Sequence, residues 1–170
     1  MKAINYDEVA GNYDERFKAY KQDGIALRLQ ELAREIDAEA ILELGCGTGH
    51  WLDVLHDSRK VFGIDRSSGM LKKAVERHGN YFLINGDIDS LPFKDNTFDM
   101  IFCVNALHHF PNPSETILEV RKLLKQGGAL TIINMDPHAR EDQWFIYDYF
   151  PSTYETDLNA IHRRQPLRNG

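Results

Sequence analysis

The sequence lacks the features that mark membrane, secreted and repetitive proteins. None of its apolar runs approaches the roughly 18 consecutive residues that a membrane-spanning helix needs. The first segment, MKAINYDEVAGNYDERF, is too polar for a secretory signal peptide. No internal repeat, low-complexity segment or Gly/Ser linker divides the 170 residues. These absences predict one globular domain with no membrane span.

Cysteine and positive charge are also scarce. The two cysteines, Cys46 and Cys103, cannot build the disulfide framework of a small secreted domain. Both stand in apolar or glycine-rich surroundings, which is typical of reduced thiols and predicts a cytoplasmic location. The 20 Lys and Arg residues are outnumbered by 26 Asp and Glu residues, which gives a net charge of −6. Since nucleic-acid binders normally carry a basic stripe, we expect no nucleic-acid partner.

Short apolar segments recur along the middle of the chain and predict about five buried strands. They are Ala40–Leu44, Lys60–Ile64, Tyr81–Ile84, Phe98–Val104 and Ala129–Asn134. Helical patterns lie between them, and strands that alternate with helices are typical of βαβ units. The predicted fold class is therefore α/β: a Rossmann-like, doubly wound, mainly parallel sheet with helices on both faces.

Four helices are predicted around these strands. Ile25, Leu29, Leu32 and Ile36 form one apolar stripe of a helix that begins near Asp23. A second helix spans Thr48–His56, and a third runs from a cap at Ser67 to about His78. The fourth runs from a cap at Ser114 to Leu124, and Gly127 and Gly128 end it.

The same patterns divide the chain into three parts. Residues 1–22 are polar with interleaved aromatic residues and form an N-terminal arm, and residues 23–135 form the α/β core. Residues 136–170 are predicted as a helical or irregular extension, with a helix over His138–Phe150. The aromatic residues of that helix are expected to pack in the core, with lining of a substrate site as the alternative.

The most informative segment is ILELGCGTGHWL at 41–52, an apolar strand followed by three closely spaced glycines and a helix. Gly45, Gly47 and Gly49 suit a sharp turn that a ligand approaches closely. A dinucleotide site requires G-x-G-x-x-G, but here the third glycine comes one residue early. Glu43 would also repel a diphosphate, whereas its carboxylate suits a cationic amine. An NAD-dependent oxidoreductase is therefore the less favoured alternative.

Two further carboxylates follow the next two strands. Asp65 lies 22 residues after Glu43, close to the offset at which an acidic side chain reaches ribose hydroxyls. Asp87 is placed to accept a hydrogen bond from an adenine amino group, and Ile88 to lie against the ring. The structural alternatives are that Asp65 caps the following helix and that Asp87 bonds its own backbone in a turn.

These segments resemble the class I S-adenosyl-L-methionine-dependent methyltransferases, in particular their small-molecule branch. The resemblance covers most of residues 5–135 and rests on ELGCGTG at 43–49, GIDRSSGML at 63–71, NGDIDSLPF at 85–93, FDMIFCVNALHHF at 98–110 and LLKQGGALTI at 123–132. It implies S-adenosyl-L-methionine as the cofactor. In many members the pattern YDxxAxxYD, here Tyr6–Asp14, closes over it. The cofactor-binding residues that the resemblance implies are Tyr13, Glu43, Gly45, Cys46, Gly47, Gly49, Asp65, Arg66, Met70, Asp87, Ile88 and Asn105.

The resemblance implies methyl transfer to a small-molecule acceptor by in-line displacement. Proximity and desolvation are expected to be the main catalytic effects, because the cofactor itself carries the activated methyl group. A general base is needed only if the acceptor loses a proton, and His109 is the candidate. The alternative is that His108 and His109 only cap or pack the following turn. No H-x-x-x-H spacing is present, and no metal is expected.

One departure from the family concerns the end of the sheet. Family members usually add two strands after the fifth, but the 35 residues after Met135 show no convincing strand pair. An exposed fifth strand would need cover, which predicts a homo-oligomer formed through that edge. The departure also leaves open the alternative of a cofactor-binding domain that is truncated or catalytically inactive.

Overall fold

The computed structural model describes residues 5–15, 17 and 23–134. Asn5–Asn134 form one compact unit, so the described part of the N-terminal arm belongs to the same unit as the predicted core. The predicted extension at 136–170, with its helix over His138–Phe150, lies outside the described residues.

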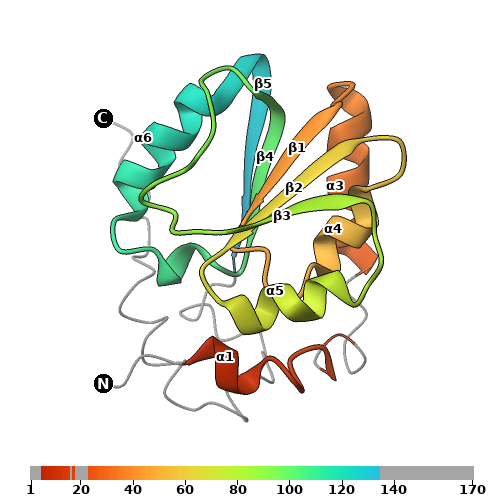
Figure 1. Cartoon of the computed structure of the whole chain (residues 1–170). Coiled ribbons are helices and arrows are strands. Elements are labelled where there is room, and N and C mark those ends of the chain that lie inside the picture. Colours follow the sequence, from red (N-terminus) through yellow and green to blue (C-terminus); the bar gives the residue numbers. More distant parts are fainter. Residues whose placement is uncertain (1–4, 16, 18–22, 135–170) are drawn as a thin grey trace, which may run out of the picture. The chain divides into compact units, whose positions relative to one another are not determined.

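Strands and helices alternate through this unit as the sequence predicts (Figure 1). The helices are α1 (Tyr6–Val9), α3 (Asp23–Glu35), α4 (His50–Leu55), α5 (Ser68–Val75) and α6 (Pro113–Leu123), with a short 3₁₀ helix, η1 (Leu107–His109). The strands are β1 (Ala40–Leu44), β2 (Lys60–Asp65), β3 (Tyr81–Asn85), β4 (Phe98–Val104) and β5 (Leu124–Ile133).

The five strands form one parallel sheet in the order β3-β2-β1-β4-β5. The central strand β1 pairs with β2 on one side and β4 on the other, which aligns Glu43 with Gly63 and Phe102. All five carboxyl ends therefore meet at one edge of the sheet, and α1 lies beyond that edge (Figure 1). The predicted α/β class and parallel sheet are confirmed.

Two apolar layers bury the sheet. On one face, Leu29 of α3, Leu52 of α4 and Leu71 of α5 pack against residues of the strands. On the other face, α6 contributes Val120 and Leu123, and the segment between β3 and β4 adds partly buried apolar side chains. A parallel sheet covered on both faces requires continuous apolar strands, and β4 is buried at every position except Asp99.

The predicted start of α6 is wrong. The cap is Asn112 rather than Ser114, and the helix begins at Pro113. Proline suits the first helical position because its φ is already helical and no N–H is needed there. The carbonyl oxygen of Asn112 accepts from the N–H of Thr116 at 3.0 Å and closes the first turn.

The glycines after α6 also act differently from the prediction. The helix ends at Leu123 and β5 begins at once, so Gly127 and Gly128 lie within β5. Leu124 pairs with Phe98, and Ala129 pairs with Met100, so the residues between them bulge out of the ladder. Gly127 adopts a φ of 84°, which a bulge of this kind favours. Regular pairing with β4 resumes at Ala129, where the strand was predicted to begin.

Candidate active site

The turn between β1 and α4 has its backbone held by β2. Gly45, Gly47 and Gly49 all have positive φ values, of 69°, 52° and 76°. The N–H groups of Gly45 and Cys46 both donate to the carbonyl oxygen of Ile64, at 2.9 and 3.1 Å. A Cβ on Gly45 would lie 2.6 Å from the Cβ of Ala106, so only glycine fits there.

Asp65, at the end of β2, completes this arrangement. Its Oδ2 accepts from the N–H of Gly47 and its Oδ1 from the N–H of Ser67, each at 2.8 Å. Burial raises the pKa of the Asp65 carboxyl above its ordinary value, and the two backbone hydrogen bonds oppose that shift. The cap of α5 is Ser67, whose Oγ accepts from the N–H of Met70 at 3.1 Å, so Asp65 does not cap this helix.

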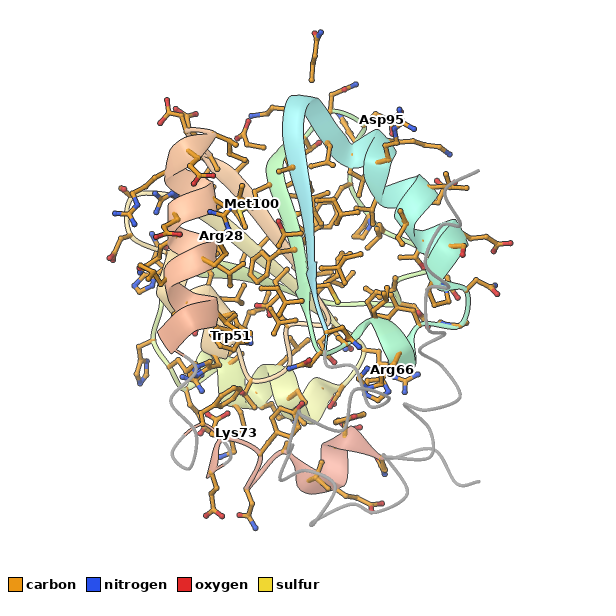
Figure 2. The ribbon with its side chains drawn as sticks, turned by 180° about the vertical axis from the view of Figure 1, so that it is seen from behind. Arg28, Trp51, Arg66, Lys73, Asp95 and Met100 are labelled. Atoms are coloured by element: carbon orange, nitrogen blue, oxygen red, sulfur yellow. The ribbon has the colours of Figure 1, made fainter. Side chains whose placement is uncertain are left out.

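A pocket of about 850 Å³, which includes space open to solvent, lies at the carboxyl ends of the strands. It brings together all the predicted site residues except one: Tyr13, Glu43, Gly45, Cys46, Gly47, Asp65, Arg66, Met70, Asp87, Ile88, Asn105 and His109. Figure 2 shows Trp51 and Arg66 near the end of the sheet that faces α1, with Met100 farther inside.

Gly49 is the exception, because it does not line this pocket. A Cβ on Gly49 would lie 3.1 Å from the Cβ of Ala74 in α5. Its left-handed φ also places the start of α4 at His50, two residues later than the predicted Thr48. Gly49 therefore leaves room for Ala74 of α5 beside the start of α4, which is a structural reason for glycine at this position.

The charges around the pocket are mainly negative. Glu43 is 1% exposed, and Asp65 and Asp87 add two more carboxylates. Arg66 is the one lysine or arginine among the described lining residues. Burial and the nearby Glu43 raise the pKa of the Cys46 thiol well above its ordinary value, so this cysteine is not a nucleophile. Such a pocket favours a ligand with a cationic group.

The N-terminal arm contributes aromatic rings to the same pocket. The Tyr6 hydroxyl lies 2.5 Å from Nε2 of His109, and the Tyr13 ring lies 3.7 Å from where a Cβ on Gly47 would stand. Phe17 stacks on His50 with 3.6 Å between the ring centroids. All six of these residues line the pocket, so the arm forms part of its wall.

His109 is neutral in this site. Burial, followed by the nearby charges of His108 and Arg66, lowers the pKa of His109 to about 3. A histidine with so low a pKa is a weak proton acceptor at neutral pH. Its hydrogen bond with Tyr6 gives it a structural contact with the arm as well.

Several lining residues were not predicted from the sequence. His50 and Trp51 begin α4 directly after the glycine turn, and Phe110 and Pro111 follow η1. Trp51 is buried, and Phe17 meets it edge to face with 5.9 Å between the centroids. The position of His50 and Trp51 next to the turn was the available signal, but the glycine pattern does not say which way these side chains point.

The described residues contain neither a metal-binding cluster nor a membrane-spanning helix. No group of three or more His, Cys, Asp or Glu residues within residues 5–15, 17 and 23–134 is placed to hold a metal ion. Over the same residues, no helix has the length and apolar character needed to cross a membrane.

The chain is similar to several known methyltransferases. The sequence profile of the family described as "Methyltransferase domain" matches residues 42–132. A demethylmenaquinone methyltransferase from Thermotoga maritima is 30% identical over 156 residues, which are 88% of this chain and 68% of that protein. This chain spans between 42% and 61% of the length of the next four curated relatives.

Solved structures are also similar to this chain. The YcgJ protein from Bacillus subtilis is 28% identical with a TM-score of 0.56, over 62% of this chain and 49% of that one. A DhpI–SAH complex is 25% identical with a TM-score of 0.67, over 79% of this chain and 67% of that one. By its matching domain, its fold and its relatives, the chain belongs to the class I S-adenosyl-L-methionine-dependent methyltransferase family.

Proposed function

We propose that this chain transfers a methyl group from S-adenosyl-L-methionine to a small-molecule acceptor. One observation carries the proposal: the pocket has three carboxylates at the carboxyl ends of β1, β2 and β3, and the turn beside them has its N–H groups in use. Gly45, Cys46 and Gly47 donate these groups within the protein, so they do not form the anion cradle of a diphosphate site. A cationic sulfonium nucleoside suits this pocket better than a dinucleotide.

Each carboxylate has a proposed partner on the cofactor. The buried Glu43 holds the ammonium group of the methionine part, where low polarity strengthens the attraction. Asp65 accepts from the ribose hydroxyls while its own position is held by Gly47 and Ser67. Asp87 accepts from the adenine amino group, and Ile88 packs against the ring. The methionine part, the ribose and the adenine thus follow one another in the order of the neighbouring strands β1, β2 and β3.

The cofactor supplies the activated methyl group, and the chain's own residues align and shield the reaction. Tyr6 and Tyr13 cover the pocket from the arm, and Asn105 and Ala106 line it after β4. Rings and apolar atoms in these places exclude water, which would otherwise compete with the acceptor. Well-oriented reactants reach effective molarities of roughly 10⁵ M or more, so positioning supplies most of the acceleration.

The acceptor is proposed to be a small molecule that reacts without strong base catalysis. The relatives include a demethylmenaquinone methyltransferase and a malonyl-[acyl-carrier protein] O-methyltransferase. His109 remains the candidate for taking a proton from the acceptor, but its low pKa makes it a weak base. The proposal therefore assigns the larger effect to proximity and desolvation. The predictions of no nucleic-acid partner, a homo-oligomer through the sheet edge and a cytoplasmic location remain predictions.

The direct test is transfer of labelled methyl from S-adenosyl-L-methionine to a panel of small-molecule acceptors. We expect S-adenosylhomocysteine (SAH) and a labelled product with at least one acceptor. Glu43→Gln should abolish most of this transfer, because it removes the buried charge. Glu39→Gln, an exposed residue just before the same strand, is the matched control and should retain it. SAH binding without turnover would favour the alternative of a catalytically inactive domain, and no SAH binding would contradict the proposal.

A further inference from the structure

The N-terminal arm contains the pair Tyr-Asp twice, at 6–7 and at 13–14. In both pairs the tyrosine lines the pocket, whereas the following aspartate does not line it and bonds to the core. The seven-residue spacing therefore separates two tasks: one side chain of each pair faces the ligand, and the other fastens the arm.

The first anchor is at the start of α5. Oδ1 of Asp7 accepts from the hydroxyl of Ser67 and from the N–H of Gly69, each at 2.7 Å. These hydrogen bonds, the one from Ser67 first, lower the pKa of the Asp7 carboxyl. A Cβ on Gly69 would lie 2.9 Å from both Cα and Oδ1 of Asp7. Gly69 therefore leaves room for Asp7, which a larger side chain at this position would displace.

The second anchor is centred on Arg77, which follows α5. Its Nε donates to the carbonyl oxygen of Thr48 at 2.6 Å, and its Nη1 donates to Asp53 at 3.0 Å. With these two contacts fixed on the core, Nη2 pairs with Oδ2 of Asp14 in the arm. Oδ1 of Asp14 also accepts from the hydroxyl of Thr48 at 2.5 Å. The Arg77 side chain is 20% exposed and the Asp14 side chain is 42% exposed, so the pair is partly shielded from water.

Other described contacts also hold the arm on the pocket side, because the Tyr6 hydroxyl bonds Nε2 of His109 and the Phe17 ring stacks on His50. Helix α1 has four residues and buries none of them, and Ala10 is the one buried residue of the described arm. Helices this short are not stable by themselves, and burial of one alanine adds little. The polar contacts of Asp7 and Asp14 therefore act together with those of Tyr6 and Phe17 in holding the arm over the pocket.

From this we propose that Arg77 and Gly69 are positioning residues for the cofactor site, although neither lines the pocket. Arg77 acts through Asp14 to hold Tyr13, and Gly69 acts through Asp7 to hold Tyr6. Their combined effect is to keep the arm closed, which slows release of the bound nucleoside. This inference rests on the proposed function, since the ligand it concerns is S-adenosyl-L-methionine or SAH.

The test for Arg77 compares Asp14→Asn, Arg77→Met and the double variant in the full chain, by calorimetric titration with SAH. Each single change should weaken SAH binding about tenfold, the effect of losing one charged hydrogen bond. The double variant should bind no worse than Arg77→Met alone, because both changes remove the same contact. Asp57→Asn, whose side chain is 93% exposed, is the matched control and should bind as the unaltered chain does.

Gly69→Ala tests the first anchor separately. Alanine favours the helix that Gly69 belongs to, so a purely structural role predicts an equal or higher melting temperature and unchanged SAH binding. We instead expect several-fold weaker binding at an undiminished melting temperature, because the new methyl group displaces Asp7. Faster dissociation of SAH in stopped flow should accompany it.

The outcomes separate the two proposals. If the unaltered chain binds SAH and the effects of Asp14→Asn and Arg77→Met add, Arg77 acts through its core contacts alone, and the positioning role is overturned. Unchanged SAH affinity in Gly69→Ala would overturn the role of Gly69. Failure of the unaltered chain to bind SAH would contradict the proposed function itself, and this inference with it.

Discussion

Two parts of the same pocket are held in different ways. The turn Gly45–Gly49 follows the central strand β1, and backbone hydrogen bonds to Ile64 of β2 fix it. The N-terminal arm, by contrast, contacts the core through side chains: the carboxylates of Asp7 and Asp14, the Tyr6 hydroxyl and the Phe17 ring. The turn cannot move without breaking its backbone hydrogen bonds to β2, whereas the arm can detach at the cost of side-chain contacts. The pocket therefore combines a preformed floor, which is the turn Gly45–Gly49, with a detachable cover, which is the N-terminal arm.

This difference suits a site that must both recognise and release a nucleoside. A rigid floor reduces the ordering cost of binding, because its groups are already in place. A cover held by few contacts opens on a faster timescale than the core unfolds. The comparison predicts that substitutions in the turn affect stability most, and that those in the arm mainly affect ligand binding.

The largest effect is expected from Gly45→Ala in the turn. The new Cβ would collide with Ala106 and would also need a left-handed backbone, which together cost about 2–5 kcal/mol of unfolding free energy. Gly11→Ala in the arm is the counterpart, because no heavy atom lies within 4 Å of its new Cβ. Urea denaturation should show a large loss for the first and about 0.5 kcal/mol or less for the second. Equal losses of unfolding free energy in the two variants would contradict the contrast between floor and cover.

An intermediate effect is expected from Asp65→Ala. Loss of charged hydrogen bonds to the ribose should weaken SAH binding by about 1.5–3 kcal/mol. Calorimetric titration measures this, and Asp57→Ala at an exposed position serves as the control. The same SAH affinity in Asp65→Ala and the unaltered chain would exclude Asp65 from the binding site.

The smallest effect concerns pH and the contact between His109 and the arm. The folded pKa of about 3 lies below the ordinary value of 6.5, so between these values the unfolded chain binds a proton that the folded chain does not. Stability should therefore fall as the pH is lowered from about 6.5 towards 3. In His109→Gln this fall should be shallower, as urea denaturation at pH 7 and pH 5 would show. An identical pH dependence in both proteins would argue against a buried, neutral His109.

The floor of the pocket was predictable from the sequence. Parallel strands bring their carboxyl ends to one edge, so Glu43, Asp65 and Asp87 must meet once the strands are recognised. Gly49 shows the limit of that reasoning, because a glycine pattern does not separate positions that face a ligand from positions that face another helix. Only the packing of Gly49 against Ala74 distinguishes the two.

The anchors of the arm were not predictable. Arg77 is 63 positions away from Asp14, and Gly69 is 62 away from Asp7. No local periodicity encodes a pair so distant in sequence, since it depends on where two separate segments of the chain meet after folding. The start of α6 was predicted wrongly for a local reason: Ser114 is a good capping residue, but Pro113 favours the first helical position, which moves the cap to Asn112.

The central claim is that the turn after β1 belongs to a site for a cationic sulfonium nucleoside rather than for a dinucleotide. Calorimetric titration of the full chain with SAH and, separately, with NADH tests it most directly. We predict saturable binding of SAH at one site per chain and no detectable heat of binding with NADH. Saturable binding of NADH with none of SAH would contradict the account.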